Sequence, residues 1–110
     1  MDPVILNRGV MSAGLWIATT YGISLALGGD FTLMDAAVDG AIMGASAIGS
    51  DYAYQWIGMT PTTMTSAIGA GVMYTAIQAA YRGSEDYATN FGMAALNDVA
   101  TEIWSNSMPK

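Results

Sequence analysis

Two long runs without a single charged residue constrain the fold of this chain more than any other feature. The first covers residues 9–29, between Arg8 and Asp30, and the second covers residues 62–81 and ends just before Arg82. At a rise of about 1.5 Å per residue, about twenty helical residues cross the roughly 30 Å hydrocarbon layer of a bilayer. Each run is therefore predicted to form a helix long enough to span a membrane.

The composition agrees with a membrane protein better than with an ordinary water-soluble one. Of the 110 residues, 53% are hydrophobic and only 11% are charged, whereas soluble domains carry roughly 25% charged residues. No stretch alternates polar and apolar residues as a half-buried strand would, and the length suits one domain. We therefore expect a single all-α membrane domain over residues 1–110.

Four helices are expected, at residues 10–28, 31–49, 62–81 and 85–105. The second, with Thr32 or Asp30 as its N-cap, contains Asp35 and Asp39. Each acid would cost about 2.5–3.5 kcal/mol at mid-bilayer, so this helix crosses only if both lie near an interface or face protein. The predicted architecture is a small helical membrane protein with two or three transmembrane helices and a C-terminal amphipathic helix.

The fourth helix places its largest apolar side chains on one stripe, because they recur at four-residue steps. The stripe consists of Tyr87, Phe91, Ala95, Val99 and Ile103, with acids and amides elsewhere around the helix. Such a helix is expected to pack on the membrane face or on protein.

Aromatic residues that favour the headgroup level cluster between the second and third helices. Tyr52, Tyr54 and Trp56 lie within residues 50–61 beside an acid and an amide, and rings of this kind are enriched at membrane interfaces. This segment is predicted to be an interfacial loop or short surface helix, and Pro61 suits the first turn of the next helix.

Small residues at every fourth position form a ridge along each apolar segment, and such ridges let helices approach closely in lipid. The ridges are Gly14, Ala18, Gly22 and Ala26 in the first segment, Ala37, Ala41, Ala45 and Gly49 in the second, and Ala67, Gly71, Thr75 and Ala79 in the third. Gly40 and Gly44 add a GxxxG motif on a neighbouring face of the second. These residues are predicted to pack helices together and to allow self-association, although such spacings also arise freely in any Ala/Gly-rich sequence.

Asp35 and Asp39 leave two interpretations open. Acids inside a membrane segment can carry protons, which would make the chain a small channel, a holin-like pore or a proton-conducting subunit. Alternatively, the two carboxylates are solvated at the membrane surface or paired with Arg8 or Arg82. The second interpretation requires no transport activity.

The residues that are missing exclude several classes of function. The chain has no His and no Cys, which excludes imidazole or thiolate metal sites and the Ser-His and Cys-His catalytic arrangements. A formal net charge of −6 with three basic residues leaves no basic patch for nucleic acid. We expect a protein that is not an enzyme and has no cofactor or metal site.

The order of motifs from Phe31 to the C-terminus resembles a known group of proteins. The residues that carry the likeness lie at 35–40, 44–51, 70–74, 90–92 and 94–95. They resemble small membrane-associated virion proteins, of the minor capsid or internal membrane type, of nucleocytoplasmic large DNA viruses, especially those infecting algae.

This resemblance implies a structural role in the internal, host-derived virion membrane, with contacts to minor capsid or shell proteins. The expected partners are the lipid bilayer, other virion or capsid proteins and further copies of the chain. Because the mean hydropathy of +0.36 is only moderately positive, a helical protein whose apolar faces are covered by partner chains is a further alternative.

Overall fold

The computed structural model describes residues 3–29 and 32–107, and these residues form four helices. They are α1 (Pro3–Leu27), α2 (Leu33–Trp56), α3 (Thr63–Arg82) and α4 (Tyr87–Ser107). No strand occurs in this part of the chain. The all-α prediction is confirmed.

Residues at the helix ends explain where two of the helices begin and where one of them ends. Thr32 and Asp35 form a capping box at α2, in which the hydroxyl accepts from the Asp35 amide and the carboxylate accepts from the Thr32 amide, both at 3.1 Å. Thr62 and Thr65 form the equivalent box at α3. Gly83 ends α3 in the left-handed conformation, with φ of 64°, which glycine adopts without steric cost.

The helices differ in extent from the sequence-based expectation. α1 begins at Pro3 rather than residue 10, because proline is well suited to a first helical turn. α2 continues to Trp56, so most of the expected interfacial segment 50–61 belongs to a long helix. Nothing between Gly49 and Trp56 breaks a helix, and the chain turns only at Gly58, where φ is 76°. Phe31 and Asp30 lie outside the described residues.

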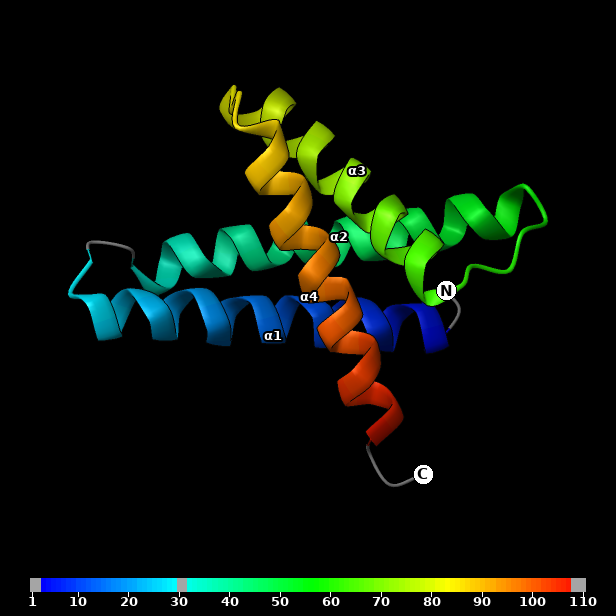
Figure 1. Ribbon diagram of the computed structural model, residues 1–110, viewed down its shortest axis with the longest axis horizontal. Coiled ribbons are helices and arrows are strands. Elements are labelled where there is room, and N and C mark those ends of the chain that lie inside the picture. Colours follow the sequence, from blue (N-terminus) through cyan, green and yellow to red (C-terminus); the bar gives the residue numbers. More distant parts are fainter. Residues whose placement is uncertain (1–2, 30–31, 108–110) are drawn as a thin grey trace.

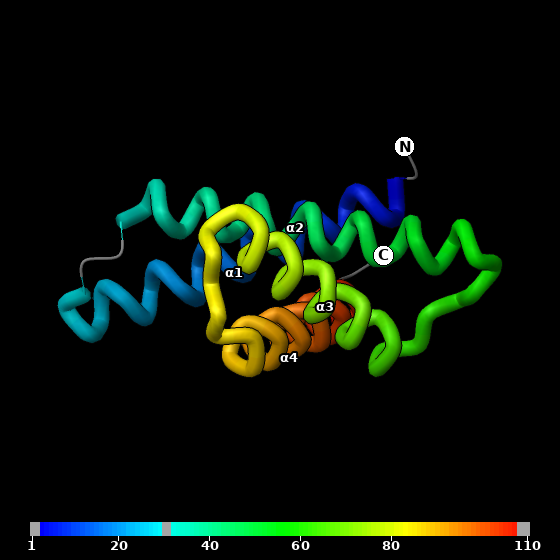
Figure 2. Tube along the Cα trace, turned by 90° about the horizontal axis from the view of Figure 1, so that it is seen from above, coloured from blue at the N-terminus to red at the C-terminus, as the bar shows by residue number. Residues whose placement is uncertain are grey.

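The helices form two antiparallel hairpins stacked in two layers. Figure 1 shows α1 and α2 side by side, with α3 and α4 crossing them obliquely. Seen from above, the α1–α2 hairpin lies on one side and the α3–α4 hairpin on the other (Figure 2). The resulting plate measures 43 × 35 × 23 Å, and both ends of the longer hairpin extend beyond the second layer (Figure 1).

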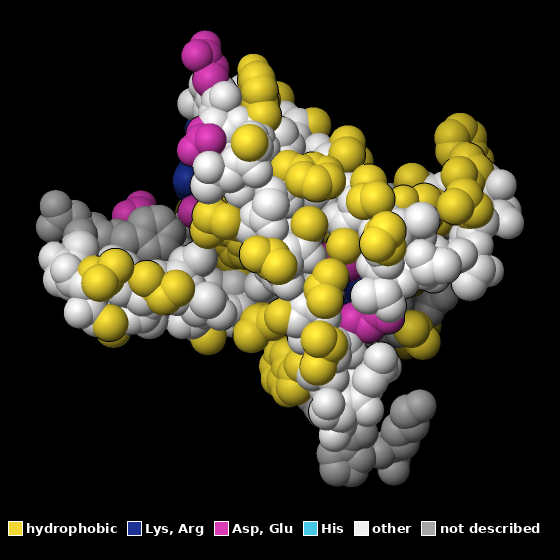
Figure 3. Space-filling view, in the orientation of Figure 1, with side chains coloured by type: hydrophobic (Ala, Val, Ile, Leu, Met, Phe, Trp, Pro, Cys, Tyr) yellow, Lys and Arg dark blue, Asp and Glu magenta, His cyan; other side chains and the backbone are white. Residues whose placement is uncertain are grey.

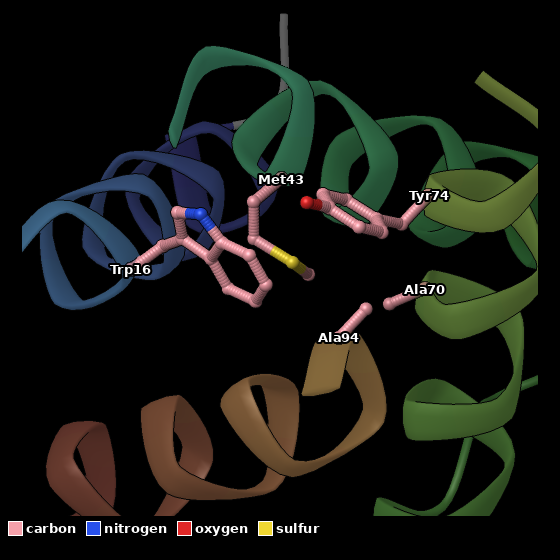
Figure 4. Close-up of a cluster of buried hydrophobic side chains, with 5 residues drawn as sticks. All are labelled: Trp16, Met43, Ala70, Tyr74 and Ala94. Carbon is pink, nitrogen blue, oxygen red and sulfur yellow. The ribbon is translucent and has the colours of Figure 1, made fainter. Parts of the chain in front are cut away.

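The apolar core is small and lies where the two hairpins cross. Trp16 of α1, Met43 of α2 and Tyr74 of α3 converge there with the methyl groups of Ala70 and Ala94 (Figure 4). The rings of Trp16 and Tyr74 lie 5.0 Å apart in a tilted arrangement. All four helices therefore contribute to a single cluster.

The α1–α2 contact depends on glycines that let the two backbones approach closely. A Cβ placed on Gly44 would lie 2.9 Å from the carbonyl oxygen of Gly9 and 3.1 Å from the Ala13 methyl. A Cβ on Gly40 would overlap the Ile17 side chain and lie 3.1 Å from the Ala13 oxygen. The GxxxG motif thus packs against Gly9, Ala13 and Ile17 of α1.

This geometry predicts opposite outcomes for two glycine substitutions. Gly44→Ala should destabilise the fold by about 1–3 kcal/mol through overpacking. Gly14→Ala, the control, meets no atom within 4 Å and should be neutral or stabilising by up to about 1 kcal/mol, because alanine favours helix. Urea unfolding in mild detergent, followed by circular dichroism, measures both. Equal stability of the two variants would contradict the close α1–α2 contact.

Candidate functional site: an apolar surface around internal ion pairs

One arginine makes polar contacts with every other helix. The Nη2 of Arg8, on α1, donates to Oδ2 of Asp98 on α4 at 2.8 Å and also to the Ser66 hydroxyl on α3. Its Nε lies 3.9 Å from Asp51 on α2, and its Nη2 lies 3.8 Å from Glu102 on α4. These five residues, called the Arg8 cluster below, place three carboxylates around one guanidinium.

The Arg8 cluster lies largely inside the protein. Asp98 is completely buried, with 0% exposure, and Asp51 is 9% exposed. Burial, and to a lesser degree the nearby charges of Asp98 and Glu102, raises the pKa of the Asp51 carboxyl, whereas Arg8 opposes this shift. Because one cation faces three acids, the cluster holds an excess of negative charge when all three are ionised.

A second ion pair joins α2 to α3. Arg82 Nη1 lies 2.6 Å from Oδ1 of Asp39, and the Gln78 amide donates to the same carboxylate oxygen at 3.3 Å. Gln78 also donates to the Tyr74 hydroxyl at 3.0 Å. The described arginines, Arg8 and Arg82, are thus both engaged with buried acids.

The interior of the fold is unusually polar. Among the described residues, ten hydrophobic and ten polar or charged side chains are buried. α4 shows the reason, because its most buried positions are Ala94, Asn97, Asp98 and Thr101. The Asn97 amide donates to the backbone and hydroxyl oxygens of Ser12 on α1 at 3.1 and 3.0 Å. The predicted apolar stripe of α4 is half-buried or exposed, from Tyr87 to Ile103, so this helix buries its polar face.

The outer surface is correspondingly apolar. Twenty large hydrophobic side chains of the described residues are exposed, and every helix contributes some of them. Hydrophobic side chains spread over much of the face seen in Figure 3, and acidic ones show at the end of the α3–α4 hairpin and in smaller patches elsewhere. Extended apolar surface of this kind marks contact with protein or membrane.

α1 is the one helix of the described residues that is long and apolar enough to cross a membrane. Core helices of soluble proteins, which are mostly buried, and signal sequences near an N-terminus can have the same length and composition. Only 17% of the apolar window of α1 is buried, and α1 lies near the N-terminus. The expectation of two or three spans is therefore supported at α1 alone among the described helices, and α3, which contains the second charge-free run, is not a candidate span.

The three predicted ridges of small residues differ in how far they are buried in the structure. Gly14, Ala18, Gly22 and Ala26 are all exposed on α1, and no side chain approaches Gly14 or Gly22. On α2, Ala41 and Ala45 are exposed, whereas Ala37 and Gly49 are half-buried. The ridge on α3 faces the protein: Ala67 and Gly71 are buried, Thr75 and Ala79 are half-buried, and Gly71 packs against Phe91 of α4. Within the chain, packing thus involves the third ridge, Gly40, Gly44 and also Gly49, which lies against the Met73 side chain of α3, and the first ridge is left open.

The predicted interfacial aromatics lie near the end of α2. Trp56 is 89% exposed, whereas Tyr52 and Tyr54 are half-buried. The Tyr54 hydroxyl donates to the Thr65 carbonyl oxygen at 2.5 Å, which ties α2 to the start of α3. Of the three rings, Trp56 is the one that is almost fully available to a bilayer or partner.

The two acids singled out in the sequence have different surroundings. Asp35 is exposed and belongs to the capping box of α2, whereas Asp39 is paired with Arg82. The structure does not bring them into one site, and the described residues contain no group of three His, Cys, Asp or Glu that could hold a metal ion. The geometry gives each acid a structural partner instead.

Sequence reasoning missed the Arg8 cluster. Its residues lie far apart in the chain, and Asp98 and Glu102 look like the solvated side of an amphipathic helix. One available signal was the position of Arg8 immediately before a long charge-free run, where a cation needs a nearby acid or water.

Comparisons with known proteins give no relative. No family model, no curated protein and no solved structure matches this chain.

The raised pKa of Asp51 predicts a specific pH dependence of stability. The folded state holds this proton more tightly than the unfolded chain, so stability falls as pH rises from 3.8 through the raised pKa. Asp51→Asn should therefore be more stable than the wild type at pH 7, and the difference should shrink as pH falls towards 3.8. Thermal unfolding at several pH values measures this.

Asp86→Asn, at an exposed acid, is the matched control and should follow the wild type at every pH. An Asp51→Asn variant whose stability difference did not change with pH would contradict the buried, proton-binding environment of Asp51.

Proposed function

We propose that this chain is a non-enzymatic structural membrane protein that joins a bilayer to neighbouring proteins. The observation that carries the proposal is a half-polar interior under an apolar surface: ten of the twenty buried side chains are polar or charged, and twenty large hydrophobic side chains are exposed. In water this arrangement exposes apolar surface at a cost, whereas in lipid or a protein interface it is favourable. A protein with this surface needs lipid or protein around it.

The α1–α2 hairpin is the layer best suited to the bilayer. Its exposed face carries one described charge, Asp35, in the first turn of α2. Asp39 points to Arg82 and Asp51 lies in the Arg8 cluster, and acids within membranes are tolerated when they are paired in this way. We propose two crossings, by residues 9–27 and 33–49, with Arg8 and Asp51 beyond the hydrocarbon at the same end of the hairpin.

The α3–α4 hairpin is the layer better suited to protein partners. It combines exposed apolar residues such as Ile68, Val72 and Leu96 with the exposed charges of Glu85 and Asp86. Mixed surfaces of this kind are typical of protein interfaces. The oblique crossing of the two hairpins (Figure 1) also argues against three parallel spans.

The resemblance to virion membrane proteins supports a specific setting for this role. In that setting the hairpin lies in the internal, host-derived membrane of a virion, and the α3–α4 layer contacts minor capsid or shell proteins. The open ridge from Gly14 to Ala26 would then be available to lipid or to a further copy of the chain.

Single cysteines test the proposed topology, because the chain has no native thiol. In sealed vesicles, a membrane-impermeant thiol reagent should label Asn7→Cys and Gln55→Cys from one side and Gly29→Cys from the other. Ala41→Cys, on the exposed face of α2, should resist labelling until detergent is added. Carbonate washing should leave the protein with the membranes.

Two results would overturn this proposal. Release by carbonate would mean that the apolar faces are covered by protein partners rather than lipid. Labelling of all three end positions from the same side would exclude the crossing hairpin, even if the protein stayed with the membrane.

A further inference from the structure

Polar contacts join α1 to α4 beyond the apolar core. Arg8 binds Asp98 at 2.8 Å, and Asn97 donates to the backbone and hydroxyl oxygens of Ser12 at 3.1 and 3.0 Å. Hollows of about 410 and 280 Å³ lie beside this crossing, and residues of both helices line each of them. The last turns of α4 lie beyond α1 (Figure 1). Regions with few packed apolar contacts open most readily, so the crossing is a place where α4 can separate from α1.

The charges at this crossing do not balance. Three carboxylates around one guanidinium leave two negative charges uncompensated when all the acids of the Arg8 cluster are ionised. Asp98 Oδ1 and Glu102 Oε2 are buried without a hydrogen-bond partner in the described residues. Arg8 Nε lies 3.9 Å from Asp51 Oδ2, which is beyond hydrogen-bond distance. Buried charge of this kind is costly unless a further cation neutralises it.

Every helix presents groups to Asp51, and the charged ones belong to α1 and α4. The charges that act on it are those of Arg8 on α1 and of Asp98 and Glu102 on α4. From α3 the cluster receives the uncharged Ser66 hydroxyl. Within the described residues, one cation therefore serves all three acids, and α2 and α3 add no second one to the cluster.

A proton is the additional cation that fits this cluster. The described residues hold no group of three acids arranged for a metal ion, whereas a proton needs a single carboxylate and almost no space. Asp51 is 9% exposed and lines a further hollow of about 410 Å³ together with Gln55 and Thr60. Its carboxylate can therefore exchange a proton with water through this hollow.

We propose that the Arg8 cluster is a proton-dependent switch that holds α4 against α1. In the closed state Asp51 carries a proton, so Arg8 compensates the two carboxylates of α4. When this proton leaves to water, Asp51 on α2 repels Asp98 and Glu102, and separation of α4 from α1 lets water reach all three acids. The switch acts within one chain and goes beyond the proposed membrane function, on which it does not depend.

The closed state holds one proton more than the open state, which fixes the direction of the switch. Water around the open cluster leaves Asp51 near its ordinary pKa of 3.8, whereas burial, and then the neighbouring acids, raise its pKa in the closed state. Between these two pKa values, the ratio of open to closed molecules should rise by up to about tenfold per pH unit. Above the raised pKa the ratio should be constant. Rising pH therefore releases α4.

Spin labels on the full-length protein in mild detergent measure this opening, because the chain has no native thiol. Asn7→Cys and Asn106→Cys place labels on α1 and α4 at two exposed positions that line the same hollow. Between about pH 4 and about pH 9, a longer label distance should grow as pH rises. Ala18→Cys with Ala45→Cys, at exposed positions of α1 and α2, is the control pair and should keep one distance. Parallel changes in both pairs would mean general unfolding and would overturn the switch.

Asp51→Asn tests whether this acid controls the opening. In the Asn7→Cys and Asn106→Cys background it should stay closed at every pH, because the neutral amide takes the place of the protonated carboxyl. Asp86→Asn, at an exposed acid, is the matched control and should open like the parent. The same pH dependence in Asp51→Asn and its parent, or a parent distance that does not change with pH, would overturn the proposal.

Infrared spectroscopy locates the proton independently of the labels. Above about pH 5, where exposed acids are ionised, the wild type should show a protonated carboxyl band that disappears over the pH range in which α4 opens. Asp51→Asn should lack this band, and Asp86→Asn should retain it. A band of equal size in Asp51→Asn would place the proton on another acid and would overturn Asp51 as its carrier.

Discussion

The ion pairs of Arg8 hold the arrangement of the whole chain together. A buried carboxylate such as Asp98 is tolerated only when a cation and hydrogen-bond donors compensate the loss of water. Arg8 compensates it from α1, and the same side chain reaches Ser66 on α3 and approaches Asp51 on α2. No other described cation contacts all the other helices, so this one guanidinium links the two hairpins, and it does so with its Nε and the Asp98 Oδ1 left without a hydrogen-bond partner.

The glycine contact and the Arg8 cluster depend on each other. Gly9 follows Arg8 directly, and its carbonyl oxygen lies against Gly44. Asp51 lies two helical turns beyond Gly44 on α2, so the close approach of the backbones brings it near Arg8. A wider α1–α2 spacing would move Asp51 away from the guanidinium. The small residues at this contact therefore affect the ion pairs of Arg8 as well as the packing of α1 against α2.

Local features of the fold could be predicted from the sequence, and long-range ones could not. The charge-free runs, Thr32 and Gly83 act through neighbouring residues, so helix content and several helix ends follow from local pattern. Which face each helix buries depends on partners distant in the chain. Small residues occur on several faces of α1 and α2, so spacing alone does not distinguish the buried Gly40 and Gly44 from the exposed Gly14 and Gly22.

α4 shows most clearly why hydrophobic pattern fails as a guide to this fold. An amphipathic helix in water buries its apolar stripe, because that removes apolar surface from solvent. In a protein surrounded by lipid or other chains, burying the apolar stripe removes little surface from water, so this effect no longer decides which face of the helix is buried. Buried polar groups then contribute through the specific bonds that they make. Asn97 with Ser12, and Asp98 with Arg8, provide such bonds at the α1–α4 crossing. The inward polar face of α4 therefore supports the proposed lipid or protein surroundings, as does the exposed apolar length of α1.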